Sequence, residues 1–393
     1  MNGSPNTMQQ LLISRVDGLR HWLDNDALPL WWANGAERPN GGFYERLGQD
    51  GMPVAGDKRR ARVQPRQAYC YAAAGKRGWN GPWTEAVTLG LNWFDKVYRR
   101  ESGLYGNLAD ENGKLIDPSF DLYNQAFALF AGATVADAIP EMAEPARKQA
   151  RQLLSILRFD YAHPIGGFEE DIPHREPLLS NPHMHLLEAA LAWEAVTNGD
   201  ETWTRLADEI AQLAMTRFID AKTGALREYF AHDWTPLGDD RGHIVEPGHQ
   251  FEWAWLLARW GELRGRSEAL AKAERLFAIG EMHGVCPVRK VAVMQINDDF
   301  SPRDPVARFW GQTEWLKAAL RLAAAVPEKR TEYLHSANRA LNAIAPFLAT
   351  PITGLWYDKL LEDGTMVNEP APASTFYHIV CAIHEAEDQL ARL

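Results

Sequence analysis

The amino-acid sequence predicts an all-α protein, an (α/α)6 barrel of six helical hairpins with short β-hairpins and long loops on one face. Two observations lead to this prediction. A glycine followed by an apolar residue recurs six times along the chain, at spacings of 57 to 70 residues. An apolar helical segment follows each of these glycines, and a more charged helical segment lies before the next one. Repeats of one buried and one exposed helix can close into a ring with an inner and an outer wall.

The repeated glycines mark a short hairpin or an irregular loop in each unit. The sequences QDG (49–51), ENG (111–113) and EDG (362–364) are typical of turns and are expected to close hairpins in these loops. The six glycine-containing pairs are Gly42-Phe43, Gly103-Leu104, Gly167-Phe168, Gly224-Ala225, Gly284-Val285 and Gly354-Leu355.

Six segments rich in alanine, leucine and aromatic residues are predicted to form the inner wall. Several are apolar on nearly every side, which is typical of a helix that is buried all round. These segments begin near Arg66, Leu122, His183, His249, Phe309 and Ser374.

Amphipathic, charged segments at residues 140–159, 200–219 and 267–282 are predicted to form outer helices. An open α-solenoid is the alternative arrangement of such units. A closed barrel is favoured because the unit is longer than most solenoid repeats, and because the last apolar segment is not a polar cap. Since no linker or low-complexity segment divides the chain, we expect residues 1–393 to form a single catalytic domain.

Composition excludes several classes of function. The net charge of −11 argues against a nucleic-acid partner, because phosphate binding needs clustered basic residues. No apolar run is long enough for a membrane span or a signal peptide, so a cytoplasmic protein without a membrane partner is expected. Three distant cysteines do not predict disulfides or a cysteine zinc site. The 15 tryptophans are compatible with a carbohydrate site or with a large helical core.

If the repeats are equivalent, the inner helices all begin at the same mouth of the barrel. The free backbone N–H groups at those helix starts suit the oxygen atoms of a polyol or an anion. The side chains expected to converge there are those of Arg66, Tyr123, His185, His249, Trp310 and His378.

Three local clusters refine this set. In EPGHQFEW, His249 and Glu252 are three residues apart and share a helix face, which predicts a histidine made more basic by a carboxylate or, alternatively, a metal-binding pair. In NPHMHLLE, we expect His185 to point inward and His183 to be structural. In APASTFYH, His378 lies one turn inside a helix that Ser374 or Thr375 can cap.

Six strings in the expected order resemble the N-acylglucosamine 2-epimerase superfamily, and the combination most resembles its mannose isomerase branch. They are RQAYCYA (66–72), LYNQAFALF (122–130), NPHMHLLEA (181–189), EPGHQFEWAW (246–255), FWGQTEW (309–315) and APASTFYH (371–378).

The resemblance implies an (α/α)6 barrel, no metal or other cofactor, and proton transfer through a cis-enediol intermediate. It implies that His249 and His378 are the acid/base pair. His185, Arg66 and Glu252 match catalytic positions near the substrate. The residues that match substrate-binding positions are Tyr123, Asn181, Glu246, Trp310 and Gln312.

The resemblance implies the metal-independent interconversion of D-mannose and D-fructose, and the histidines at the mouth suit its proton transfers, with His378 expected to be the base. His249, oriented by Glu252, is expected to open the sugar ring, and Arg66 to stabilise the enediolate oxygens. A sugar 2-epimerase uses the same groups and stays open as an alternative. The partner expected is a small monosaccharide, and the chain is expected to be a monomer or a homodimer.

A glycoside hydrolase on the same kind of barrel is a third possibility. It needs two carboxylates on opposite sides of the scissile bond. The carboxylates available for that chemistry are Asp110, Glu246 and Glu314.

Overall fold

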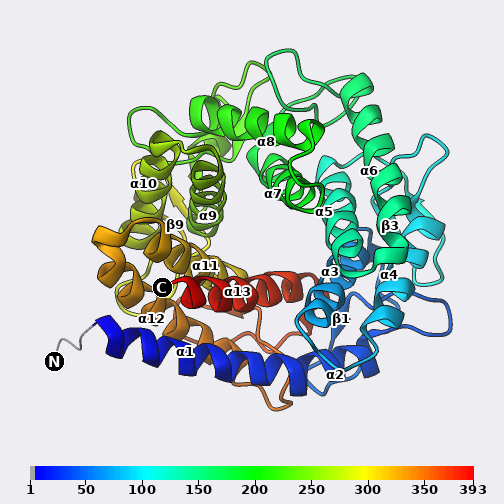
Figure 1. Cartoon of the computed structure of the whole chain (residues 1–393), viewed down its shortest axis with the longest axis horizontal. Helices are drawn as coiled ribbons and strands as arrows, with labels where there is room; N and C mark the ends of the chain where they lie inside the picture. Colours follow the sequence, from blue (N-terminus) through cyan, green and yellow to red (C-terminus); the bar gives the residue numbers. More distant parts are fainter. Residues whose placement is uncertain (1–4) are drawn as a thin grey trace.

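The computed structural model describes residues 5–393, and within them two concentric rings of helices form a barrel (Figure 1). The inner helices follow one another around the ring, and the last of them packs against the first, so the ring is closed. The predicted (α/α)6 barrel is therefore confirmed. The inner helices are α3 (Val63–Lys76), α5 (Leu122–Ala138), α7 (Ser180–Val196), α9 (Pro247–Arg264), α11 (Phe309–Ala325) and α13 (Ala373–Arg392).

Each inner helix has an outer partner that is its neighbour in sequence, with one exception. The outer partner of α13 is α1, from the other end of the chain, which also contacts α12. Figure 1 shows this helix in blue along the outside of the red α13. The outer helices are α1 (Pro5–Trp22), α4 (Trp83–Tyr98), α6 (Pro140–Asp160), α8 (Glu201–Leu213), α10 (Ser267–Gly284) and α12 (Arg330–Ile344). A short helix, α2 (Leu28–Leu30), follows α1.

The two rings differ in how their side chains are distributed. On α8 the buried side chains of Trp203, Leu206, Ala207 and Ile210 recur with helical spacing, and the opposite face is exposed. On α9 nearly every residue is buried, because this helix packs against inner neighbours on both sides and against α10 behind it. Its C-terminal end is closed by Gly265, whose φ of +61° is a left-handed cap conformation.

Short antiparallel strands join neighbouring units at one mouth of the barrel. Each sheet pairs the loop before one inner helix with the loop of the next unit, so the loops hold one another in register. The pairs are β1 (Arg46–Leu47) with β12 (Ala371–Pro372), β2 (Arg59–Arg60) with β3 (Leu108–Ala109), β3 with β4 (Leu115–Asp117), β5 (Leu178–Leu179) with β6 (Tyr229–Phe230), β7 (Ile244–Val245) with β8 (Gln295–Asn297), β8 with β9 (Pro302–Asp304), and β10 (Ala307–Arg308) with β11 (Lys359–Leu360).

The three predicted turns are confirmed, but one of the six glycines predicted to mark the start of a loop is not at such a position. Gly51, Gly113 and Gly364 each have a positive φ at the predicted turns, where a residue with a Cβ would be strained. Gly284, however, ends α10 and does not begin a loop. In that unit the residue with positive φ before the loop is Lys290, with φ +59°. A non-glycine residue in this position removed the signal on which the sequence prediction depended.

None of the helices within residues 5–393 is long and apolar enough to cross a membrane.

Candidate active site

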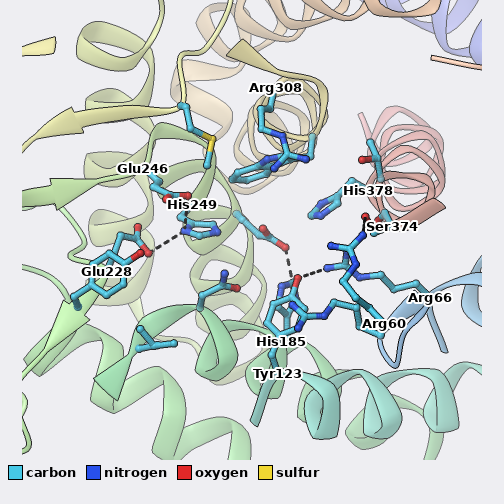
Figure 2. Close-up of a pocket in the computed structure, with 18 residues that line it drawn as sticks. Arg60, Arg66, Tyr123, His185, Glu228, Glu246, His249, Arg308, Ser374 and His378 are labelled. Atoms are coloured by element: carbon cyan, nitrogen blue, oxygen red, sulfur yellow. Dashed lines mark hydrogen bonds and ion pairs between the residues drawn. The ribbon is translucent and has the colours of Figure 1, made fainter. Parts of the chain in front are cut away.

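A pocket of about 320 Å³ opens at the mouth where the inner helices begin (Figure 2). This volume lies at the lower end of the range for small-molecule sites and suits a monosaccharide. Nine of the ten site residues predicted from the sequence line it. They are Arg66, Tyr123, Asn181, His185, Glu246, His249, Glu252, Trp310 and His378.

His378 on α13 is held by a buried carboxylate. Its Nδ1 lies 2.8 Å from Oε1 of Glu314 on α11, and Glu314 is fully buried. Burial, together with the positive charges of Arg66 and Lys317, holds the pKa of His378 well below its ordinary value. His378 is therefore neutral at pH 7, and a neutral imidazole can accept a proton.

His249 on α9 is in the opposite electrostatic situation. Its Nδ1 lies 2.9 Å from Oε2 of Glu228 and 3.4 Å from Oε2 of Glu246. Burial alone would lower the pKa of His249, but these two carboxylates outweigh it and raise the pKa to about 10. His249 is therefore protonated at pH 7, with Nε2 left to donate to a substrate.

The predicted partner of His249 was wrong. Glu252 does not hydrogen-bond to His249; its Oε1 lies 4.0 Å from Nδ1 of His185 instead. The carboxylate that holds His249 comes from Glu228, directly before β6, which the pairing with β5 brings beside α9. Helical spacing correctly put Glu252 on the same helix as His249, but the carboxylate that binds His249 is that of Glu228 in the loop before this helix.

Trp310 lies between the two histidines. Its ring centroid is 5.1 Å from that of His249 and 5.6 Å from that of His378. The ring also covers Gly248, where an added Cβ would come within 2.4 Å of two ring carbons. Trp310 therefore contacts both histidines in the lining of the pocket, and Gly248 leaves room for its indole.

Arg66 is the best-fixed cation in the pocket. It donates from Nη1 to the backbone oxygen of Ser374 at 2.9 Å and from Nη2 to the hydroxyl of Tyr123. Its guanidinium also stacks on Phe127, 4.2 Å from the ring centroid, and on Tyr377, 5.1 Å away. A guanidinium held on several sides is preorganised to stabilise negative charge on a substrate.

His185 and Glu252 lie deeper in the pocket, beside one another. His185 Nδ1 is 3.2 Å from Oε2 of Glu188, and burial lowers the pKa of His185 to about 4. Both carboxylate oxygens of Glu252 are buried without a hydrogen-bond partner in the described part of the chain. Burial raises the pKa of Glu252 well above its ordinary value, with Glu314 adding to the effect. Glu252 is thus a hydrogen-bonding group still available to a ligand.

His183 and Asn181, two further residues of the NPHMHLLE cluster, differ in role. As predicted, His183 is structural: its Nδ1 is 2.8 Å from the backbone oxygen of Leu179, and its Nε2 accepts from the backbone N–H of Phe168. The side chain of Asn181 faces the pocket, and its Oδ1 has no partner among residues 5–393.

Gln312 does not line the pocket, so the predicted role of its side chain in substrate binding is wrong. Its side chain is fully buried and donates to the backbone oxygen of Ala292 while accepting from the backbone N–H of the same residue. The same paired bond recurs in other units and ties each loop to its inner helix. The equivalent pairs are Gln64 with Phe43, Gln125 with Tyr105, and Gln250 with Leu226.

Replacement of Gln312 by leucine is expected to destabilise the fold by about 1–3 kcal/mol, because the backbone N–H and C=O of Ala292 lose their buried partner. The KM for the sugar substrate is expected to stay within twofold. Urea denaturation and steady-state kinetics measure the two quantities. A large rise in KM without a loss of stability would restore Gln312 to the substrate site.

Several residues that line the pocket were not predicted from the sequence. The loops and helix starts contribute Arg60, Arg62, Leu179, Glu228, Tyr229, Met294, Arg308, Ser374 and Thr375. The three arginines are each held from outside the pocket by a carboxylate. Arg60 pairs with Glu45, Arg62 with Asp121, and Arg308 with Asp358. Their positions depend on strand pairing between units, which no single helical string reveals.

Two overlapping groups of buried side chains, partly lining the pocket and partly beneath it, have metal-ligand atoms within 4.8 Å of one another. Both include Glu252; the first adds His185 and Glu188, and the second adds Glu314 and His378. The cluster contains a cation of its own, since Nζ of Lys317 lies 2.7 Å from Oε2 of Glu314. We interpret it as a charge-compensated network, and metal independence stays a prediction.

A third such group, His163, Glu169 and His232, lies outside the pocket. Nδ1 of His163 accepts from the backbone N–H of Ile165 and from the indole N–H of Trp234. The Nε2 of His163 must then carry the proton, which it donates to the backbone oxygen of His232. This imidazole has no free lone pair, so its hydrogen bonds argue against a metal ion.

The three carboxylates considered for a glycosidase do not form a pair across the pocket. Asp110 accepts backbone N–H groups in the turn between β3 and β4 and does not line the pocket. Glu314 lies beneath the pocket in its contacts with His378 and Lys317. Glu246 alone of the three faces the cavity.

Comparison with known proteins decides the family. A family model described as N-acylglucosamine 2-epimerase (GlcNAc 2-epimerase) matches residues 42–382. The chain belongs to the N-acylglucosamine 2-epimerase family. A relative from Rhizobium meliloti, named mannose-6-phosphate isomerase, is 56% identical over 95% of this chain and 97% of that protein. A D-mannose isomerase from Marinomonas mediterranea is 24% identical over 88% of this chain and 91% of its own length.

Solved structures agree on the fold. The cellobiose 2-epimerase of Spirochaeta thermophila superimposes with a TM-score of 0.85 at 20% identity, over 98% of both chains. This member of the N-acylglucosamine 2-epimerase family is accordingly an enzyme of the isomerase and epimerase class that processes small sugars.

Proposed function

We propose that this enzyme interconverts D-mannose and D-fructose by proton transfer between C2 and C1 of the opened sugar. The observation that carries the proposal is the opposite protonation of two histidines in one small pocket. His378 is neutral, and His249 is protonated. A base and an acid that both exist at pH 7 are what an aldose–ketose isomerisation requires.

Ring opening is assigned to His249. Its Nδ1 is occupied by Glu228, so Nε2 donates a proton to the ring oxygen O5 as the C1–O5 bond breaks. The proton of the O1 hydroxyl passes to the same nitrogen, which leaves an aldehyde at C1 and restores the imidazolium.

The isomerisation itself is assigned to His378. Its Nε2 takes the proton from C2, the C1–C2 double bond forms, and O1 accepts a proton from His249, which gives the cis-enediol. His378 then returns its proton to C1 while the O2 hydroxyl loses its proton to His249, and the C2 carbonyl forms. We assign to Arg66, which is held by the backbone oxygen of Ser374, the stabilisation of negative charge on O1 and O2 during these steps, an effect typically worth a few kcal/mol.

The test is proton NMR of the enzyme with mannose in deuterated water containing EDTA. Fructose with deuterium at C1 supports the proposal and shows that no removable metal is required. If glucose with deuterium at C2 forms first, the 2-epimerase alternative replaces the isomerase. The absence of any product from mannose, fructose or glucose would contradict action on free hexoses.

A second candidate is the same reaction on the 6-phosphate esters. It is favoured by the arginines at the pocket rim and by the name of the 56% identical relative. Arg60 and Arg308 are partly exposed there and can offer N–H groups to a phosphate. The same assay with mannose 6-phosphate distinguishes the two. A kcat/KM at least tenfold above that for mannose assigns the phosphate ester as the substrate.

A further inference from the structure

A buried lysine beneath the pocket has no place in the mechanism above. Lys317 lies on α11, three residues after Glu314, and both side chains are completely inaccessible to solvent. A fully buried lysine is rare because an ammonium ion loses much of its hydration energy when it leaves water. The close contacts of Lys317 are Oε2 of Glu314 at 2.7 Å, Sγ of Cys381 at 3.7 Å, and the ring of Trp255 at 3.8 Å.

Glu314 connects this lysine to the base of the reaction. Its second oxygen, Oε1, lies 2.8 Å from Nδ1 of His378. Lys317, Glu314 and His378 therefore form a continuous chain from the core to the pocket, on two neighbouring inner helices. Glu314 and Lys317 are both completely buried, so these contacts are shielded from solvent.

The protonation of Glu314 decides which nitrogen of His378 can accept a proton. An ionised carboxylate only accepts hydrogen bonds, so His378 must carry its proton on Nδ1 and keep a lone pair on Nε2. A neutral carboxyl group can instead donate to Nδ1. The proton of His378 would then lie on Nε2, and the nitrogen that faces the sugar would have no lone pair.

On the basis of the isomerase function, we propose that Lys317 is a positioning residue that keeps Glu314 ionised and thereby selects the tautomer in which His378 acts as the base. Among the described carboxylates, Glu314 is the one whose oxygen contacts the ammonium of Lys317 directly. Glu188 is bound by His185 and Tyr377, and Glu252 has no hydrogen bond in the described residues.

The electrostatics of the cluster agree with this role. Burial raises the pKa of Glu314, and Lys317 is the strongest influence that opposes it. Removal of the ammonium would leave the carboxylate of Glu314 buried with the influence of Lys317 on its pKa gone, while burial would still favour its neutral form. Glu314 would then take up a proton, and the exchange of donor and acceptor at Nδ1 would follow.

The experiment replaces Lys317 by methionine, which has a similar length and no charge. We expect kcat to fall by about 100-fold with KM within twofold, because the base is present but in the wrong tautomer. Nitrogen-15 NMR of His378 should show the proton on Nδ1 in the wild type and on Nε2 in the variant. If the methionine variant does not fold, Lys317→Gln is measured, with the same expected direction.

The matched control is Arg321→Met. Arg321 lies one turn further along α11 and is also buried, but its carboxylate partners are Glu262 and Glu385, away from the pocket. If loss of any buried ion pair on α11 lowered kcat, Arg321→Met would do the same; we expect it to lower only stability. An Nε2-protonated His378 in the wild type, or an unchanged kcat in Lys317→Met, would overturn the proposal. Since the NMR signal needs no substrate, it tests the positioning role even if mannose is not the substrate.

Discussion

Replacement of His378 by alanine is expected to lower kcat for mannose isomerisation by about 10²- to 10⁴-fold, the range of a general base. His185, the other neutral imidazole that lines the pocket, lies on a different inner helix, α7, and is not expected to replace His378 at C2. The exchange of the C2 proton with deuterated water should disappear together with product formation, and both are measured by NMR.

The two histidines can be tested separately because their roles differ. If His249 opens the ring, His378→Ala should still accelerate the interconversion of mannose anomers, whereas His249→Ala should not. Anomer exchange is measured by magnetisation transfer between the two C1 proton signals. Retention of isomerisation in His378→Ala would refute the assignment of His378 as the base. Loss of anomer exchange in that variant would show that His378 also takes part in ring opening.

The parts of the fold that could be predicted from the sequence are those encoded within single helices. Helical spacing and all-round apolarity identified the inner helices, and their common direction placed His249 and His378 at one mouth. The closing helix was not predicted, because α1 pairs with α13 across the whole length of the chain. Its amphipathic pattern identifies an outer helix, but no local signal says that it joins the last unit.

The site was predicted less completely, for a physical reason. Side chains on the first two turns of an inner helix are placed by the helix itself, so Arg66, His185 and Trp310 were found. Glu228 directly precedes β6 and Arg308 lies in β10, so their positions depend on pairing with another unit. Gln312 was predicted to bind substrate because it lies near the start of an inner helix. Its side chain instead hydrogen-bonds to the loop backbone at Ala292.

Glu228, which lies outside the helices, is expected to have a large effect on the pH dependence of kcat/KM, because its carboxylate helps to keep His249 protonated. In the wild type, the charged form of His249 persists up to its pKa of about 10, so kcat/KM should decline only on the far alkaline side. In Glu228→Gln the effect of burial on the pKa of His249 is opposed only by the charges that remain, chiefly Glu246 and then Glu252. The alkaline limb of the pH profile should therefore move down by about one to three units. At pH 9 the loss of kcat/KM should exceed tenfold, and at pH 6 it should be much smaller.

The charge on His249 should also make the stability of the fold depend on pH, with lower stability at alkaline pH. A histidine whose pKa is raised on folding stabilises the protein fully below its unfolded value of about 6.5 and loses that contribution as the pH rises through the folded value near 10. The melting temperature of the wild type should therefore fall more steeply than that of Glu228→Gln between pH 6.5 and 10. Glu209→Gln, whose carboxylate pairs with Arg158 between outer helices, is the matched control and should leave the activity profile unchanged. An alkaline limb that stayed near pH 10 in Glu228→Gln would show that Glu228 is not needed to keep His249 charged.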